Sequence, residues 1–195
     1  MNDEDRRKLL RIAREAVEAE VLGKPRPPRP REPIGAEGFS GAFVTLRTHG
    51  RLRGCIGTFA PRGTLPETVQ EMAVAATHDS RFLHMPLTAQ ELPELEIEIS
   101  VLSPLVRTED PLSLELGKHG IYIRRGAASG CFLPQVATET GWSKEEFLSR
   151  CCEGKAGLPA DAWRDPATEV YLFTAEVFSE ADYRSGGRDR PATQA

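Results

Sequence analysis

The strongest constraint on the fold is a hairpin pattern in residues 41–59, GAFVTLRTHGRLRGCIGTF. Two runs rich in apolar and β-branched residues, 41–48 and 51–59, flank the dipeptide His49-Gly50. A two-residue loop in which glycine supplies a positive φ is the commonest connection between antiparallel strands. Both faces of the expected hairpin carry apolar side chains, so we expect it to lie inside the protein.

The two-residue loop also predicts which residues face each other across the hairpin, and a three-residue loop would shift this pairing. Side chains directly opposite each other share a face of the sheet, as do residues two apart on one strand. The expected pairs are Cys55 with Val44, Arg53 with Leu46, Gly57 with Ala42 and Gly54 with Thr45.

Cys55 lies between Gly54 and Gly57 in the octet LRGCIGTF, and two interpretations of it stay open. Glycine inside a strand marks a bulge or a close approach of backbone or ligand, which would leave the thiol accessible. Arg53, expected on the same face, would favour the nucleophilic thiolate. Free cysteine is also among the most buried residue types, so a small apolar side chain in the core is the alternative.

No histidine or cysteine pair has the spacing of a zinc site, and we expect no metal site. The sequence contains no GxGxxG, GxxxxGK[ST], HExxH or CxxC motif, and it does not indicate a cofactor. A nucleophilic cysteine needs a base, usually histidine. We keep His84, in the loop 78–86, and His119, before an expected strand, as candidate catalytic residues beside Cys55.

Two sets of charged residues are further candidates. Glu96 and Glu98 lie on the polar face of the alternating strand LEIEISVL and form a candidate carboxylate pair, although exposure alone explains them. Asp79 and Arg81 flank Ser80 and are expected to form a local ion pair that fixes the loop. Surface pairs of this kind contribute little to stability.

The remaining patterns predict an α+β fold with a mainly antiparallel sheet flanked by helices, because strands and helices alternate without regular βαβ spacing. Capping boxes are expected at Thr88–Glu91 and Ser143–Glu146. We expect a single domain over residues 1–183 and a disordered tail over 184–195. The expected helices are 3–22, 67–77 and one from Ser143 to Cys152, and the expected strands beyond the hairpin are 95–102, 120–125, 131–133 and 169–178.

Composition and charge exclude several classes of protein. The formal net charge of −4 and the 7% of aromatic residues make a nucleic-acid partner unexpected. No apolar run reaches the roughly 20 residues of a membrane span. The charged start MNDEDRRKLL lacks the apolar core of a signal peptide, and the few cysteines suit a reducing compartment, so we expect a cytoplasmic protein. The proline-rich segment 24–33 is expected to be an extended connector.

Six motifs in a fixed order resemble the AMMECR-type domain family: SGAFVTL, LRGCIGTF, DSRF with a nearby PLT, HGI, FLPQVATETGW and KAGLPADAW. The human member is named for the AMME chromosomal region, and the microbial members include the AmmeMemoRadiSam system protein A group. The resemblance covers about residues 5–180. One departure is RFLHMPLT, which carries two extra residues, His84 among them, where many members read RFPPLT.

The resemblance implies two subdomains with a cleft between them, the larger containing both chain ends. The LRGCIGTF residues are expected near this cleft. The family pattern implies Arg53, Gly54, Gly57 and Arg81 as ligand-binding residues, to which we add Glu98. The resemblance brings no established activity, so whether the chain is an enzyme stays open.

Two functions follow as hypotheses. In the first, the chain holds a ligand-binding or catalytic cleft in which Cys55 is the nucleophile or contacts the ligand. In the second, it is a non-enzymatic adaptor that acts with a Memo-like protein and a radical SAM protein, which microbial members often have as gene neighbours. A nucleic-acid-linked regulator is a weaker alternative. The sequence does not predict the oligomeric state.

Overall fold

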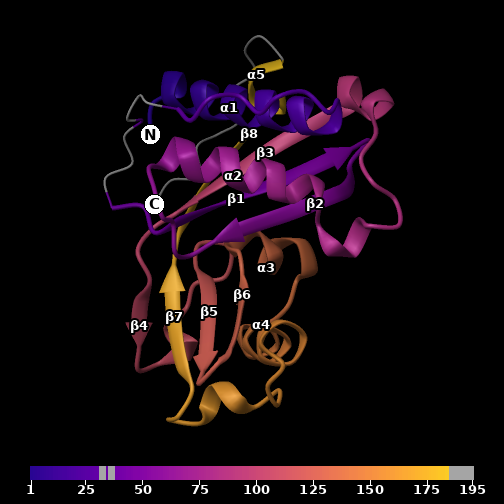
Figure 1. Cartoon of the computed structure of the whole chain (residues 1–195). Helices are drawn as coiled ribbons and strands as arrows, with labels where there is room; N and C mark the ends of the chain where they lie inside the picture. Colours follow the sequence, from indigo (N-terminus) through magenta and orange to yellow (C-terminus); the bar gives the residue numbers. More distant parts are fainter. Residues whose placement is uncertain (31–33, 35–37, 185–195) are drawn as a thin grey trace. The chain divides into compact units, whose positions relative to one another are not determined.

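The computed structural model describes residues 1–30, 34 and 38–184 (Figure 1). It contains two four-stranded sheets, and the strand pairs that can be followed residue by residue are antiparallel. Helices flank both sheets, so the predicted α+β class is confirmed. The chain divides into two compact units. Unit 1 comprises Met1–Glu37, Gly41–Ser100 and Val177–Ala195, and unit 2 comprises Gly38–Ser40 and Val101–Glu176.

Unit 1 contains the predicted hairpin. Its sheet has the strand order β2-β1-β3-β8, which makes β2 an edge strand. Figure 1 shows helices α1 and α2 lying across this sheet. The elements are α1 (Asp3–Val21), β1 (Gly41–Thr48), β2 (Arg51–Thr58), α2 (Leu65–Thr77), the short helices η1 (Ser80–Phe82) and η2 (Ala89–Glu94), β3 (Leu95–Leu102), β8 (Ala175–Ser179) and α5 (Ala181–Arg184).

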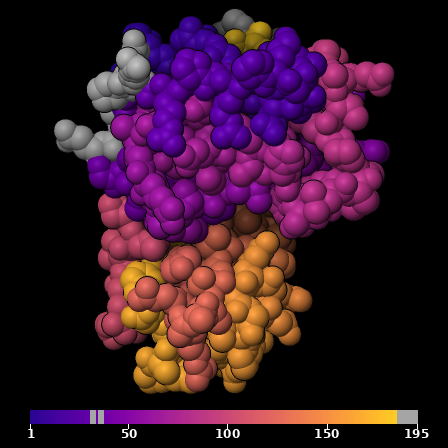
Figure 2. Space-filling view, in the orientation of Figure 1, coloured from indigo at the N-terminus to yellow at the C-terminus, as the bar shows by residue number. Residues whose placement is uncertain are grey.

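Local sequence explains both long helices of unit 1. Asn2 caps α1 by accepting a hydrogen bond from the backbone N–H of Asp5, and acidic residues fill the first turn. The space-filling view shows α1, in indigo, at the surface of unit 1 (Figure 2). Helix α2 begins two residues before the predicted start, because Thr64 and Glu67 form a capping box that the prediction missed.

Unit 2 packs its helices against a sheet of strand order β4-β7-β5-β6. Its core combines aliphatic and aromatic side chains, among them the rings of Phe132 and Phe147, stacked at 5.4 Å between centroids. The elements are β4 (Val106–Thr108), η3 (Pro111–Ser113), β5 (Gly120–Arg125), β6 (Ala128–Phe132), α3 (Pro134–Thr140), α4 (Lys144–Cys151), η4 (Cys152–Ala156), η5 (Ala162–Arg164) and β7 (Glu169–Phe173).

The structure corrects three element predictions. The strand predicted over 169–178 is two strands in different sheets, β7 and β8. It breaks at Thr174, whose backbone exchanges hydrogen bonds with the backbone N–H and the hydroxyl of Ser103 instead of a sheet neighbour. Strand β6 begins at Ala128 rather than at residue 131, and α3 was not predicted because its seven residues are too few for a periodic pattern. Of the predicted tail, residues 185–195 lie outside the described residues.

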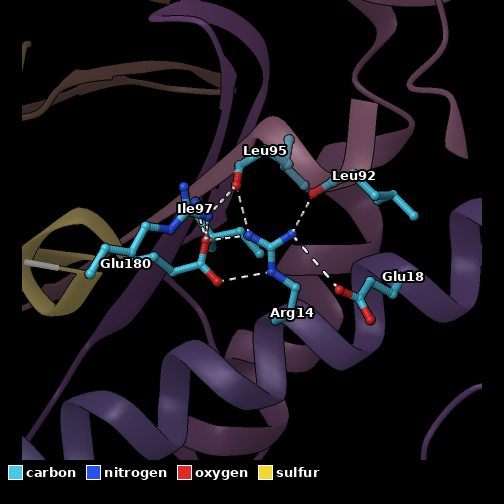
Figure 3. A network of polar contacts seen from close by, with 7 residues as sticks. Arg14, Glu18, Leu92, Leu95, Ile97 and Glu180 are labelled. Carbon is cyan, nitrogen blue, oxygen red and sulfur yellow. Dashed lines mark hydrogen bonds and ion pairs between the residues drawn. The ribbon is translucent and has the colours of Figure 1, made fainter. Parts of the chain in front are cut away.

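A half-buried arginine joins three parts of unit 1 (Figure 3). Arg14 of α1 pairs with the Glu180 carboxylate through two of its nitrogens, Nε at 2.9 Å and Nη2. It also donates to the carbonyl oxygens of Leu92 and Leu95, at 3.1 Å and 2.8 Å. Glu180 in turn accepts from the backbone N–H of Ile97 at 3.0 Å. The guanidinium of Arg14 therefore connects helix α1 with the start of β3 and with the segment after β8.

Replacing Arg14 by methionine will destabilise the protein by about 1–3 kcal/mol, because the half-buried Glu180 carboxylate and two backbone carbonyls lose their donor and Glu180 keeps the longer ion pair with Arg184, at 3.5 Å. Urea unfolding followed by circular dichroism measures this free energy. The control is Arg11→Met on the exposed side of the same helix, which should change it by less than about 0.5 kcal/mol. Equal effects of the two substitutions would show that this network does not stabilise unit 1.

Candidate functional site

The hairpin turn forms as predicted, but the pairing beyond it is wrong. His49 and Gly50 both have positive φ, 51° and 74°, so the loop has two residues. Thr48 pairs with Arg51 in the expected register. A β-bulge then shifts the ladder by one residue, because Arg53 is an extra residue in β2. The observed pairs are Leu46 with Gly54, Thr45 with Cys55, Val44 with Ile56, Phe43 with Gly57 and Ala42 with Thr58.

The packing around Gly54 explains why β2 has a glycine next to this bulge. A Cβ atom at this position would lie 2.0 Å from the carbonyl oxygen of Ala76 in α2. Strand and helix therefore approach backbone to backbone at Gly54, on the face of the sheet that α2 covers. Because side chains alternate along a strand, Cys55 lies on the opposite face, together with Thr45 and Gly57.

The environment of Cys55 is polar. Its side chain is half-buried, and the hydroxyl of Thr45 donates a hydrogen bond to Sγ at 3.2 Å. Cys151 and Cys152, by contrast, are fully buried in the core of unit 2, and burial raises the pKa of both thiols. Cys131 is half-buried in β6. Cys55 thus differs from the two buried thiols of unit 2 in its exposure and in its hydroxyl partner.

Asp79 and Arg81 hold the backbone of Cys55 from the open edge of β2. The Asp79 carboxylate accepts a hydrogen bond from the backbone N–H of Cys55 at 3.0 Å. Arg81 Nη2 donates to the carbonyl oxygen of Cys55 at 3.3 Å and to Asp79 at 2.6 Å, and Nε donates to Asp79 at 3.0 Å. The ion pair expected from the sequence exists, but Asp79 is buried, which the interpretation as a surface pair did not predict.

This arrangement stabilises the charged form of Asp79. Hydrogen bonds from the Arg81 side chain are the largest cause of its low pKa, about 2, and the backbone N–H groups of Cys55 and Arg81 add to them against the cost of burial. The same pairing raises the pKa of Arg81, with a smaller contribution from the charge of Cys55. Both groups therefore carry their charges at neutral pH.

Arg53 was expected on the same face as the Cys55 thiol, but its guanidinium pairs with Glu91. Its Nε and Nη2 donate to the Glu91 carboxylate at 2.7 Å and 3.1 Å, and Nη2 also donates to the carbonyl oxygen of Pro86. Glu91 belongs to the predicted capping box with Thr88, which forms. Arg53 therefore anchors the segment before η2, and the cation beside the backbone of Cys55 is Arg81.

The other predicted site residues lie at separate places. His84 is exposed between η1 and η2. His119 belongs to unit 2, where its Nδ1 accepts a hydrogen bond from the backbone N–H of Glu115. Glu98 is half-buried on β3, and its neighbours Ile97 and Ile99 are fully buried. Gly57 admits the ring of Phe43, which a Cβ atom would meet at 2.1 Å.

Sequence reasoning missed Thr45 as a neighbour of the thiol and Asp79 as a residue that holds Cys55. The bulge hid the first, and a loop that returns to the strand edge hid the second. Within residues 1–30, 34 and 38–184, no group of three or more His, Cys, Asp or Glu side chains is placed to hold a metal ion. The helices of the same ranges include none that is long and apolar enough to cross a membrane.

The proteins to which this chain is similar include several from archaea. The crystal structure of the uncharacterised protein PH0010 from Pyrococcus horikoshii has a TM-score of 0.83 and 37% identity, covering 92% of this chain and 93% of that chain. Protein TK0174 from Thermococcus kodakarensis is 43% identical, over 94% of each chain. Protein MK0488 from Methanopyrus kandleri is 43% identical, over 93% of this chain and 91% of its own.

The chain belongs to the AMMECR1 family, whose sequence profile matches residues 10–178. The resemblance inferred from its motifs is therefore confirmed.

Replacing Gly54 by alanine will destabilise the protein by more than about 2 kcal/mol, because the added methyl group overlaps the backbone of α2. Gly154 is the control, since a Cβ there meets nothing within 4 Å and its φ is not in the left-handed region. Thermal unfolding of Gly54→Ala and Gly154→Ala measures the difference. A Gly54→Ala protein as stable as the wild type would contradict the close approach.

Replacing Asp79 by asparagine will lower stability by about 2 kcal/mol at pH 7, the equivalent of a pKa depressed from 3.8 to about 2. The stabilisation is complete above about pH 4 and is lost as the pH falls towards 2, so wild type and variant should converge there. Urea unfolding between pH 2 and 7 measures this convergence. The exposed Glu71→Gln on α2 is the control, and a pH-independent gap for Asp79→Asn would contradict the prediction.

Proposed function

We propose that the protein acts through a thiol site at Cys55, where the cysteine serves as a nucleophile or as a direct contact for a small ligand. The observation that carries the proposal is the hydrogen bond from Thr45 Oγ1 to Cys55 Sγ on a half-buried side chain. The guanidinium of Arg81 lies beside the backbone of the same cysteine, donating to its carbonyl oxygen at 3.3 Å.

The surroundings of the thiol are held in place, as a catalytic or binding group requires. Both backbone polar groups of Cys55 are engaged by the Asp79–Arg81 pair, and β1 fixes the strand on its other side. A pre-positioned side chain loses less freedom when a ligand binds. His84, which belongs to the same unit as Cys55, stays a candidate for a base that completes the site when a ligand is present.

Alkylation of the folded protein with iodoacetamide at pH 7.5, read residue by residue with mass spectrometry, tests the proposal. Cys55 should react first, Cys131 more slowly, and Cys151 and Cys152 only after unfolding, because those two are fully buried. A Cys55 that stays unmodified until the protein unfolds would overturn the proposal and leave LRGCIGTF as a packing motif.

Thr45→Val removes the hydroxyl donor and should slow alkylation of Cys55 about fivefold, the effect of one hydrogen bond of about 1 kcal/mol. Thr48→Val on the same strand is the matched control, because the buried Oγ1 of Thr48 has no hydrogen-bond partner among the described residues. The control should leave the alkylation rate unchanged. Equal rates for the two variants would exclude Thr45 from the chemistry of the thiol.

A second candidate function is an adaptor that binds a Memo-like or a radical SAM protein. The observation that favours it is a pair of exposed apolar side chains, Leu83 (65% exposed) and Met85 (52% exposed), which flank His84 in the segment where this chain departs from the family pattern. Exposed apolar groups of this kind mark interaction sites. Loss of partner binding in Leu83→Ser/Met85→Ser, with unchanged alkylation of Cys55, would support this function over the first.

A further inference from the structure

We propose that the Cys55 site takes ligands that carry a carboxylate, and that Nη1 of Arg81 binds this group. The inference rests on the proposed function, since it names the class of ligand for the same thiol. Of the two arginines expected from the sequence as ligand-binding residues, it assigns the binding of this group to Arg81 and not to Arg53.

The hydrogen bonds of Arg81 leave one end of its guanidinium available. Nε and Nη2 are occupied by Asp79 and by the carbonyl oxygen of Cys55. Nη1 makes no hydrogen bond or ion pair within the part of the chain that the structure describes, and the side chain is 49% exposed. A guanidinium held through Nε and Nη2 presents the N–H groups of Nη1 in a constant direction, where a carboxylate oxygen can accept a charge-assisted hydrogen bond.

Asp79 does not repel such a ligand at short range. Its side chain is 2% exposed, and both of its oxygens already accept hydrogen bonds, Oδ1 from Arg81 and Oδ2 from Arg81 and Cys55. A ligand approaching from solvent therefore meets the N–H donors of the pair rather than its oxygens.

Arg53 is a poor alternative. Its side chain is 12% exposed, and the nitrogens Nε and Nη2 are held by Glu91 and Pro86. An anion at this position would have to displace the Glu91 carboxylate, which also caps η2. Of the two arginines, only Arg81 combines an available nitrogen with a contact to Cys55.

The test compares two alkylating agents of similar size, iodoacetate and iodoacetamide, at Cys55. The ratio of their rates is measured for the protein and for N-acetylcysteinamide as a neutral reference thiol. Iodoacetate bears the carboxylate, so the ratio at Cys55 should exceed the reference about two- to fivefold, the range for an exposed ion pair. Sodium chloride at about 1 M should lower the ratio by screening.

The salt response separates this site from the charge of the whole chain. A net charge of −4 alone would repel iodoacetate, and added salt would then raise the ratio. A ratio at or below the reference, or one that rises with salt, overturns the inference while leaving the proposed function in place. Failure of Cys55 to react with iodoacetamide overturns the proposed function and the inference together.

Paired substitutions assign the effect to one arginine. Arg81→Gln/Asp79→Asn removes one complete ion pair and should bring the ratio to the reference value. Arg53→Gln/Glu91→Gln removes the other pair, keeps a residue that can form the capping box, and should leave the ratio unchanged. The ratio corrects for changes in accessibility, because the iodoacetamide rate reports them. An unchanged ratio in the first variant, or an equal loss in both, contradicts the role of Arg81.

Discussion

The close approach of β2 to α2 at Gly54 is the constraint on which the rest of unit 1 depends. A carbonyl oxygen of the helix occupies the space of a side chain, so the strand must present glycine there. The adjacent bulge at Arg53 brings Gly54 into that position and changes the register of every later pair. The pairing of the LRGCIG residues with β1 thus depends on one backbone contact. As a consequence, Cys55 faces Thr45.

The edge of β2 explains why a charged pair is buried beside the thiol. The N–H and C=O groups of an edge residue point outward and would otherwise pair with another chain. Asp79 and Arg81 satisfy both groups of Cys55, as an adjacent strand would. Because Asp79 is buried, the pair has a structural role that a surface ion pair lacks, and its guanidinium end remains at the surface.

Patterns within a few residues predicted most elements, whereas contacts between distant segments were not predictable. The hairpin turn, β3 and two capping boxes depend on local sequence, and all of them formed. The bulge depends on a helix more than 20 residues away in sequence, so alternation alone gave the wrong pairing for Cys55. The break at Thr174 likewise depends on Ser103, which no local pattern around residues 169–178 contains.

The two interpretations of LRGCIGTF, close packing and an accessible thiol, apply to opposite faces of one strand. Gly54 faces α2, where the backbones meet, and this contact explains the glycine without involving Cys55. Cys55 faces the other way, towards the hydroxyl of Thr45, and no close backbone approach requires a small residue there. Packing at Gly54 therefore accounts for the position of the thiol, and the question of its chemistry concerns the opposite face of the strand.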